Sequence, residues 1–189
     1  QIENLARRAA RLTEQLLMFA RRQAIRTRTF DVNLSLDQLL QMLHRLLGEH
    51  VTVKWVRLDP HLWVEADSTL IDQAVTNLCV NAIHASPSGA EVVLRVDLPP
   101  GVEPPASALA AAGPFVRFSV EDHGPGLPEG KQDLVFEPFF TTKPIGEGTG
   151  LGLPIARSIA QDLGGWLEAH PVTPHGTRFD LYLPVHGRS

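Results

Sequence analysis

The stretch GEGTGLGL, residues 146–153, carries a glycine at every second position and leads directly into an apolar segment with helical spacing. The first amide hydrogens of a helix have no partner within the helix, and the helix dipole favours negative charge beside them. Glycines let phosphate oxygens approach that backbone, and Pro154 is compatible with a first helical turn. The stretch lacks the Gly-Lys-Ser/Thr ending of a P-loop and does not directly follow a strand, as a dinucleotide-binding loop would. We therefore expect a phosphate site at the start of a helix over residues 152–163.

A second glycine-containing stretch, DHGPG at residues 122–126, follows a segment of alternating apolar residues. A buried carboxylate at Asp122 can accept a hydrogen bond from an exocyclic amine such as that of adenine. Gly124 and Gly126 let the backbone pass close to a flat ring. The same pattern also occurs in ordinary turns, so the motif alone is not specific.

Three phenylalanines lie between these two stretches, in FEPFFTTK at residues 136–143. The surrounding segment is rich in glycine and proline, so the rings can clamp a mobile segment onto the domain. Lys143 would then reach phosphate oxygens. An equally good interpretation is a buried apolar patch that anchors an ordinary loop.

A helix is predicted from an N-cap at Asp67 or Ser68 to about Ala85, with a polar line beside its apolar face. The apolar face is formed by Leu70, Ala74, Leu78 and Ala82, and the polar line by Gln73, Asn77, Asn81 and His84. Two asparagines in a helix interior cost about 1 kcal/mol together relative to alanine, which indicates another use for them. An asparagine carbonyl oxygen is a suitable neutral ligand for Mg²⁺. The alternative is an ordinary solvated helix face.

The remaining patterns predict one layer of helices on a mixed β-sheet, an α+β fold. Ser35 is the expected N-cap of an amphipathic helix that ends near Leu47. Strands are predicted near residues 29–33, 51–56, 62–65, 92–96, 116–120, 166–169 and 177–183. We expect hairpin-like neighbours in the sheet, with the strands at 51–56 and 62–65 joined through Asp59-Pro60. The segment from Pro99 to Pro114 is expected to form an exposed loop.

Apolar residues near the N-terminus recur at alternating steps of three and four, at Ile2, Leu5, Ala9, Leu12, Leu16 and Phe19. The average step of about 3.5 keeps one seam facing a partner helix. We expect this helix to pair within a bundle or across a dimer, or alternatively to pack on its own domain. The boundary is placed at residue 28.

The composition is that of an ordinary globular protein, with 189 residues, 43% hydrophobic residues and a formal net charge of −4. This charge gives no reason to expect a nucleic-acid partner. The single cysteine, Cys79, excludes an intramolecular disulfide and is interpreted as a core residue. No apolar run approaches the roughly 20 residues that span a bilayer.

The four motifs together resemble a known family. Asn77-x-x-x-Asn81, Asp122-x-Gly124-x-Gly126, Phe136-x-Pro138-Phe139 and Gly146 to Leu153 are similar, in this order, to the N, G1, F and G2 boxes of sensor histidine kinases. Their ATP-binding catalytic domain belongs to the gyrase, Hsp90, histidine kinase and MutL superfamily. The resemblance implies a two-layer α/β sandwich of the Bergerat type, with ATP between the central helix and a lid over about residues 128–147. It also implies two parts: residues 1–28, the second helix of the dimerisation and phosphoacceptor bundle, and residues 29–189, the catalytic domain.

The resemblance also assigns roles to single residues. Asn81 would coordinate Mg²⁺, Asp122 would bind the adenine amine, and Asn77, His84 and Lys143 would act at the phosphates. The implied nucleotide contacts are Asn77, Asn81, His84, Asp122, Gly124, Gly126, Phe136, Lys143, Gly146, Gly148, Thr149, Gly150, Leu151 and Gly152.

The implied function is transfer of the γ-phosphoryl group of ATP to a histidine of the bundle, and from there to an aspartate of a response regulator receiver domain. None of the eight histidines stands in the His-Glu/Asp box of the family, so we expect the acceptor to lie outside this sequence. Members of the superfamily that hydrolyse ATP resemble one another in having a glutamate, which activates water, at the position of Asn77. We therefore expect this chain to hydrolyse ATP slowly. The expected partners are the bundle, a second subunit and the receiver domain, with the domain in the cytoplasm and any membrane anchor upstream. Two alternatives stay open: a regulatory nucleotide-binding module without transfer, and a serine kinase of the anti-sigma type.

Overall fold

The computed structural model describes residues 25–47, 52–58, 62–106, 108, 113–127, 130, 132–142 and 148–185. The predicted N-terminal bundle helix lies outside the described residues. The domain boundary at residue 28 therefore stays a prediction.

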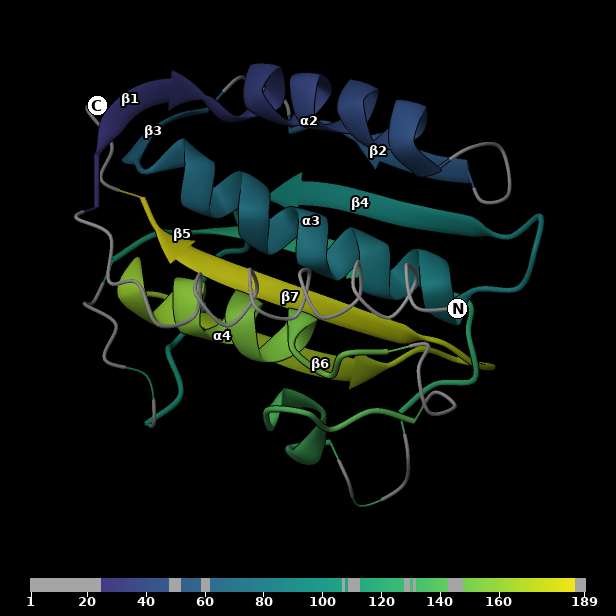
Figure 1. The fold of residues 1–189 in the computed structure, drawn as a ribbon. Helices are drawn as coiled ribbons and strands as arrows, with labels where there is room; N and C mark the ends of the chain where they lie inside the picture. The colour runs from purple at the N-terminus through teal and green to yellow at the C-terminus, as the bar shows by residue number, and fades with distance from the viewer. Residues whose placement is uncertain are drawn as a thin grey trace, which may run out of the picture.

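In the described part of the chain, three helices cover one face of a mixed five-stranded sheet, as Figure 1 shows. The helices are α2 (Val32–Leu47), α3 (Ser68–Ala85) and α4 (Gly152–Asp162), with a 3₁₀ turn η1 (Leu134–Phe136). The strands are β1 (Arg28–Asp31), β2 (Thr52–Val56), β3 (Trp63–Ala66), β4 (Glu91–Asp97), β5 (Phe115–Glu121), β6 (Trp166–Pro171) and β7 (Thr177–Pro184). The sheet order is β2-β4-β5-β7-β6, with β2 parallel to β4 and the other pairs antiparallel. This arrangement confirms the predicted α+β sandwich.

The core lies between the helices and the sheet, where alternate apolar residues of the strands pack against the apolar face of α3. The inward strand residues are Val92, Leu94 and Val96, then Val116, Phe118 and Val120, then Phe179, Leu181 and Leu183, all buried. On α3 the buried face includes Ala74, Leu78 and Ala82 as predicted, but it turns toward Ile71 and leaves Leu70 only partly buried. Cys79 is buried in this core, and burial raises the pKa of its thiol to about 12, which confirms its interpretation as a core residue.

Two local predictions are wrong. The helix α2 begins at Val32, before the expected cap at Ser35. Asp31 takes the capping position instead, because its Oδ1 accepts hydrogen bonds from the amides of Asn33 (2.8 Å) and Leu34 (3.2 Å). Ser35 lies inside the helix, where its hydroxyl donates to Asp72 Oδ1 at 3.2 Å.

The strands β2 and β3 are not hairpin neighbours. β3 pairs with β1 in a separate two-stranded sheet, and β2 pairs in parallel with β4. A parallel pair needs a long crossover, which β3 and α3 provide here.

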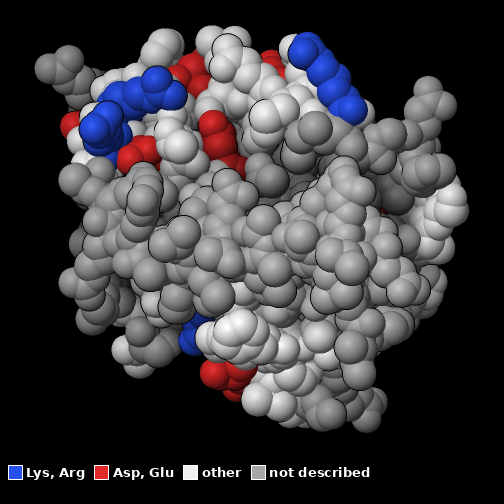
Figure 2. Space-filling model, viewed as in Figure 1, with Lys and Arg blue, Asp and Glu red and all other residues white. Residues whose placement is uncertain are grey.

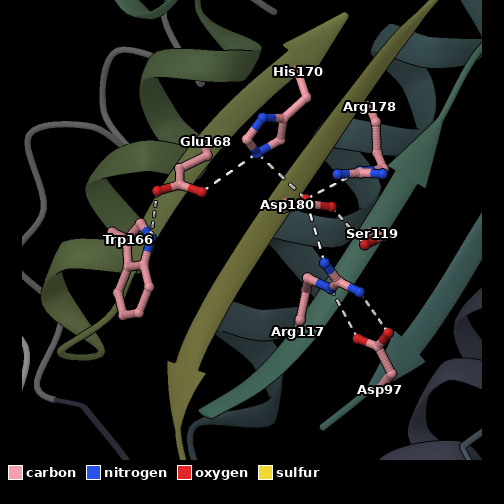
Figure 3. A network of polar contacts seen from close by, with 8 residues as sticks. All are labelled: Asp97, Arg117, Ser119, Trp166, Glu168, His170, Arg178 and Asp180. Carbon is pink, nitrogen blue, oxygen red and sulfur yellow. Dashed lines mark hydrogen bonds and ion pairs between the residues drawn. The ribbon is translucent and has the colours of Figure 1, made fainter. Parts of the chain in front are cut away.

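The face of the sheet opposite the helices is closed by a network of charged side chains, drawn in Figure 3. Asp180 on β7 is 0% exposed and accepts from Ser119 Oγ (2.5 Å) and Arg178 Nε (3.1 Å). Two further cationic groups approach Asp180 Oδ2: Arg117 Nη1 at 3.8 Å and, when protonated, His170 Nε2 at 3.5 Å. Hydrogen bonds from Arg117 to Asp97, at 2.9 and 2.6 Å, continue the network to β4. Asp180 therefore lies on the face of the sheet opposite the helices.

Described charged side chains of both signs are interspersed on the helix face. In the view of Figure 2, which matches that of Figure 1, basic and acidic side chains both lie along the upper edge, where Figure 1 draws β1 and α2. Among the described residues, no helix is long and apolar enough to cross a membrane.

Candidate functional site

The polar line of α3 contains one buried amide nitrogen that has no partner among the described residues. This atom is Asn77 Nδ2. A buried donor left unsatisfied costs about 1–3 kcal/mol, so an external acceptor is the simplest reason for its place. The alternative of an ordinary solvated helix face does not explain this atom.

A cavity of about 470 Å³ lies in front of Asn77, between α2, α3 and α4. Its lining includes Gln38, Leu39, Met42, Asp72, Gln73, Thr76, Asn77 and Ile155. Burial raises the pKa of Asp72, against the hydrogen bond from Ser35 and the charge of Arg28. The volume falls within the range of small-molecule sites, and Ile155 brings the first turn of α4 to the same cavity.

Asp122 follows β5 directly and lies near the C-terminal end of α3, where two hydrogen bonds hold its carboxylate in place. It is 1% exposed, and its Oδ1 accepts from the amides of Gly124 (2.9 Å) and Thr177 (3.2 Å). Burial raises the pKa of this carboxyl, and the two amide hydrogen bonds oppose that rise. Both donors go to Oδ1, and no donor among the described residues reaches Oδ2. This second oxygen can therefore accept from the amine of a ligand.

Close packing explains why residue 124 is a glycine, which the sequence alone did not indicate. A Cβ on Gly124 would lie 2.6 Å from the carbonyl oxygen of Ala85, at the end of α3. The glycine therefore lets the turn after β5 pack against the helix. Asp122 therefore lies beside the C-terminal end of α3.

The glycine-rich loop ends at the N-terminus of α4, as predicted. The N-cap residue, Leu151, makes no side-chain capping hydrogen bond, so the first-turn amides can bind a ligand. Gly150 has φ +63°, and a Cβ there would lie 2.5 Å from the carbonyl carbon of Phe139. Gly148 and Thr149 lie in the described part of this loop, and Gly152 is the first residue of α4.

The three phenylalanines take different positions. Phe136 is 8% exposed, and its ring meets that of Phe179 edge-on, with centroids 6.3 Å apart. Phe140 is partly buried, whereas Phe139 is 62% exposed with φ +69°. Phe136 thus acts as an anchor in the core, and its contact with a nucleotide stays a prediction.

The structure brings several predicted site residues together on α3 and the two adjoining loops. Asn77, Asn81 and His84 lie on α3, with His84 exposed in its last turn. Lys143 and Gly146 lie outside the described residues. Sequence reasoning missed the cavity residues of α2 and also Arg157, whose guanidinium lies over the Phe136 ring. No local signal could have revealed that contact, because the two residues are far apart in the chain.

Comparisons with known proteins agree with this geometry. Residues 66–187 match the family described as histidine kinase-, DNA gyrase B-, and HSP90-like ATPase. The chain is 38% identical over 188 residues to the sensor kinase CckA of Brucella abortus, which is 97% of this chain and 20% of that protein. It is 30% identical over 185 residues to the sensor histidine kinase ZraS of Klebsiella oxytoca, which is 97% of this chain and 37% of ZraS.

A solved structure is also similar. The catalytic domain of the histidine kinase ThkA, in a nucleotide-free form, superposes with a TM-score of 0.68 and 29% identity, covering 85% of this chain and 96% of that one. By contrast, the chain spans only 20% and 37% of the lengths of the two curated relatives.

Proposed function

Because the chain belongs to the family of histidine kinase-, DNA gyrase B- and HSP90-like ATPases, we propose that it binds ATP and supplies the γ-phosphoryl group to a histidine outside this sequence. The observation that carries the proposal is the buried Nδ2 of Asn77, which lacks a partner among the described residues at a cavity shared with the first turn of α4.

The nucleotide would lie along α3. Its adenine amine donates to Asp122 near Ala85, and its phosphates extend toward Asn81 and Asn77. The rise of α3 from Ala85 to Asn77 is about 12 Å, which suits an extended nucleoside triphosphate. Asn77 donates to a phosphate oxygen, and the amides of the first turn of α4 bind the same negative charge.

The side-chain oxygen of Asn81, one turn from Asn77, fits a magnesium ion that takes its other ligands from phosphates and water. When bound, magnesium neutralises phosphate charge that develops during transfer. Neutral amide groups suit this role, because they add no negative charge beside the triphosphate. Lys143 would stabilise the phosphates from the lid. His84 lies one residue before Ala85, so in this orientation of the nucleotide it would lie at the adenine end of α3 and not at the phosphates first expected for it.

Transfer, rather than hydrolysis, follows from the residue at position 77. An amide cannot accept a proton from water at neutral pH, so Asn77 cannot serve as a general base. The domain then acts by positioning the γ-phosphoryl group until a histidine nitrogen reaches it. A response regulator aspartate is the proposed final acceptor, and the dimerisation bundle is the proposed partner. No observation favours the regulatory module without transfer.

The test is a transfer assay. The domain is mixed with magnesium, ATP labelled on the γ-phosphate, and a separately produced helix pair carrying the acceptor histidine of the full-length protein. We expect acid-labile, base-stable label on that histidine, and none with Asn81→Ala. Binding of ATP without any label on the helix pair would favour a regulatory module instead.

A further inference from the structure

The cavity in front of Asn77 extends from this residue toward the N-terminus of α3. Five residues line that part of it: Gln38 and Met42 of α2, and Asp72, Gln73 and Thr76 of α3. Helices α2 and α3 lie side by side (Figure 1), and the Ser35 hydroxyl of α2 donates to Asp72 Oδ1 at 3.2 Å. We propose that this part of the cavity, the α2–α3 groove, is the docking site for the dimerisation bundle and receives its acceptor histidine. This inference rests on the proposed function.

The proposed position of ATP determines the side from which an acceptor can approach. With adenine at Asp122 and the γ-phosphoryl group near Asn77, the ADP part of the nucleotide lies along the C-terminal half of α3. In phosphoryl transfer the attacking and leaving atoms lie roughly in line. The histidine must therefore approach from the N-terminal side of Asn77, and the α2–α3 groove lies on that side.

The transfer step needs only that the imidazole ring be brought into line. A lone pair on one ring nitrogen forms the N–P bond, while the bond from the γ-phosphorus to the bridging oxygen breaks and ADP leaves with that electron pair. The phosphorylated ring carries a positive charge until its other N–H proton passes to water. The contribution of the groove is to hold the helix that carries this ring.

The α2 side of the groove offers a surface that suits a helix. Gln38 and Met42 are four residues apart, so they lie on one line of α2. Both are exposed, Met42 to 47%, and the buried Leu39 lines the same cavity. A groove between two helices can hold the apolar face of a third, and a methionine side chain adapts to such a contact.

The charges of the groove and of the bundle are complementary. Among the described residues that line the cavity, Asp72 is the only charged one, and bound ATP would add further negative charge. Residues 1–24, in the predicted second helix of the bundle, contain two glutamates and five arginines: Arg7, Arg8, Arg11, Arg21 and Arg22. Electrostatic attraction therefore favours the bundle as the occupant of the groove.

Matched charge changes on α2 test the docking. Gln38→Lys and Gln38→Glu place a charge in the groove. Gln41→Lys and Gln41→Glu make the same changes at an exposed α2 residue that is not among those lining the cavity. Met42→Ala removes apolar contact area without adding a charge. The transfer assay at saturating ATP, with the separately produced helix pair as the varied substrate, gives kcat and the KM for the helix pair, and calorimetry gives the ATP affinity.

The two Gln38 variants should change the KM for the helix pair in opposite directions. We expect Gln38→Lys to raise it about fivefold and Gln38→Glu to lower it about threefold, because the basic bundle is repelled or attracted. Met42→Ala should raise it about fivefold. In these variants kcat and ATP affinity should stay within about twofold of wild type, at an unchanged melting temperature. The Gln41 variants should match the wild type.

An unchanged KM in both Gln38 variants would overturn the inference, and so would equal shifts at positions 38 and 41. A change in ATP affinity without a change in this KM would assign the groove to the nucleotide and would also overturn it. A wild-type domain that binds ATP but labels no helix pair would instead refute the proposed transfer, and the docking inference with it.

Discussion

The amide of Phe139 donates a 2.9 Å hydrogen bond to the carbonyl oxygen of Gly150 and so joins the turn after η1 to the loop that leads into α4. Both residues have left-handed backbone conformations, with φ +69° at Phe139 and +63° at Gly150. Such conformations are uncommon for a bulky residue such as phenylalanine and persist only where the surroundings impose them. The pair thus forms a junction between the turn after η1 and the start of α4.

Gly150→Ala should break this junction. The new Cβ would meet the Phe139 backbone at 2.5 Å, and alanine is strained at positive φ. We expect the free energy of unfolding to fall by about 2 kcal/mol and ATP affinity to fall with it. Gly113→Ala, where the new Cβ meets nothing within 4 Å, is the control and should change neither quantity. Equal stability of the two variants in urea unfolding would contradict the proposed junction.

Asn77→Ala should separate stability from binding. It removes a buried donor that has no partner in the described structure and adds a better helix former. Without nucleotide, the variant should be as stable as the wild type or about 1 kcal/mol more stable. Its affinity for ATP–magnesium should fall at least about tenfold, because a phosphate oxygen loses its donor. A clear loss of stability in the apo protein would mean that Asn77 has an internal partner.

The pH dependence of the stability of Asp122→Asn tests the raised pKa of the buried Asp122 carboxyl. Burial raises the pKa of Asp122 above its ordinary value of 3.8, so folding favours the protonated form. The stability that this group contributes is present below pH 3.8 and is lost as pH rises through the folded-state pKa. The stability of Asp122→Asn relative to wild type should therefore increase from acid pH to about pH 7. Urea unfolding across this range measures it, and a constant difference would refute the raised pKa.

Asp180→Asn should lower the stability of the fold and leave ATP binding nearly unchanged. The variant removes the buried carboxylate that Arg178 and Arg117 approach on the face of the sheet opposite the helices. We expect the free energy of unfolding to fall by about 2–3 kcal/mol, with ATP affinity within about twofold of wild type. Glu91→Gln, in an exposed pair with Lys54 at 3.7 Å, should cost less than about 1 kcal/mol. A large loss of ATP affinity would show that the two faces are coupled.

Regular patterns in the sequence predicted most of the fold. The spacing on α3 and the alternation on β4, β5 and β7 were informative because each element buries one face. The cap of α2 was predicted wrongly because Asp31 and Ser35 are both good caps, and the choice depends on where the chain leaves β1. The pairing of β2 with β4 and of Arg157 with Phe136 could not be predicted, because residues distant in the chain make these contacts.

The candidate site was predictable in its chemistry but not in its geometry. The amide groups, the Asp122 carboxyl and the glycine-rich loop suggested a nucleotide from their residue types alone. That Gly124 packs on Ala85, and that Asn77 faces a cavity shared with Ile155, depends on how the helices pack on the sheet.

Whether this domain holds ATP through magnesium on Asn81 can be decided by calorimetric titration of ATP with magnesium into the wild-type domain and Asn81→Ala. We expect one ATP bound per wild-type chain, and binding weakened at least about tenfold in Asn81→Ala at an unchanged melting temperature. Absence of binding by the wild type, or equal affinity in the two proteins, would refute the proposed site.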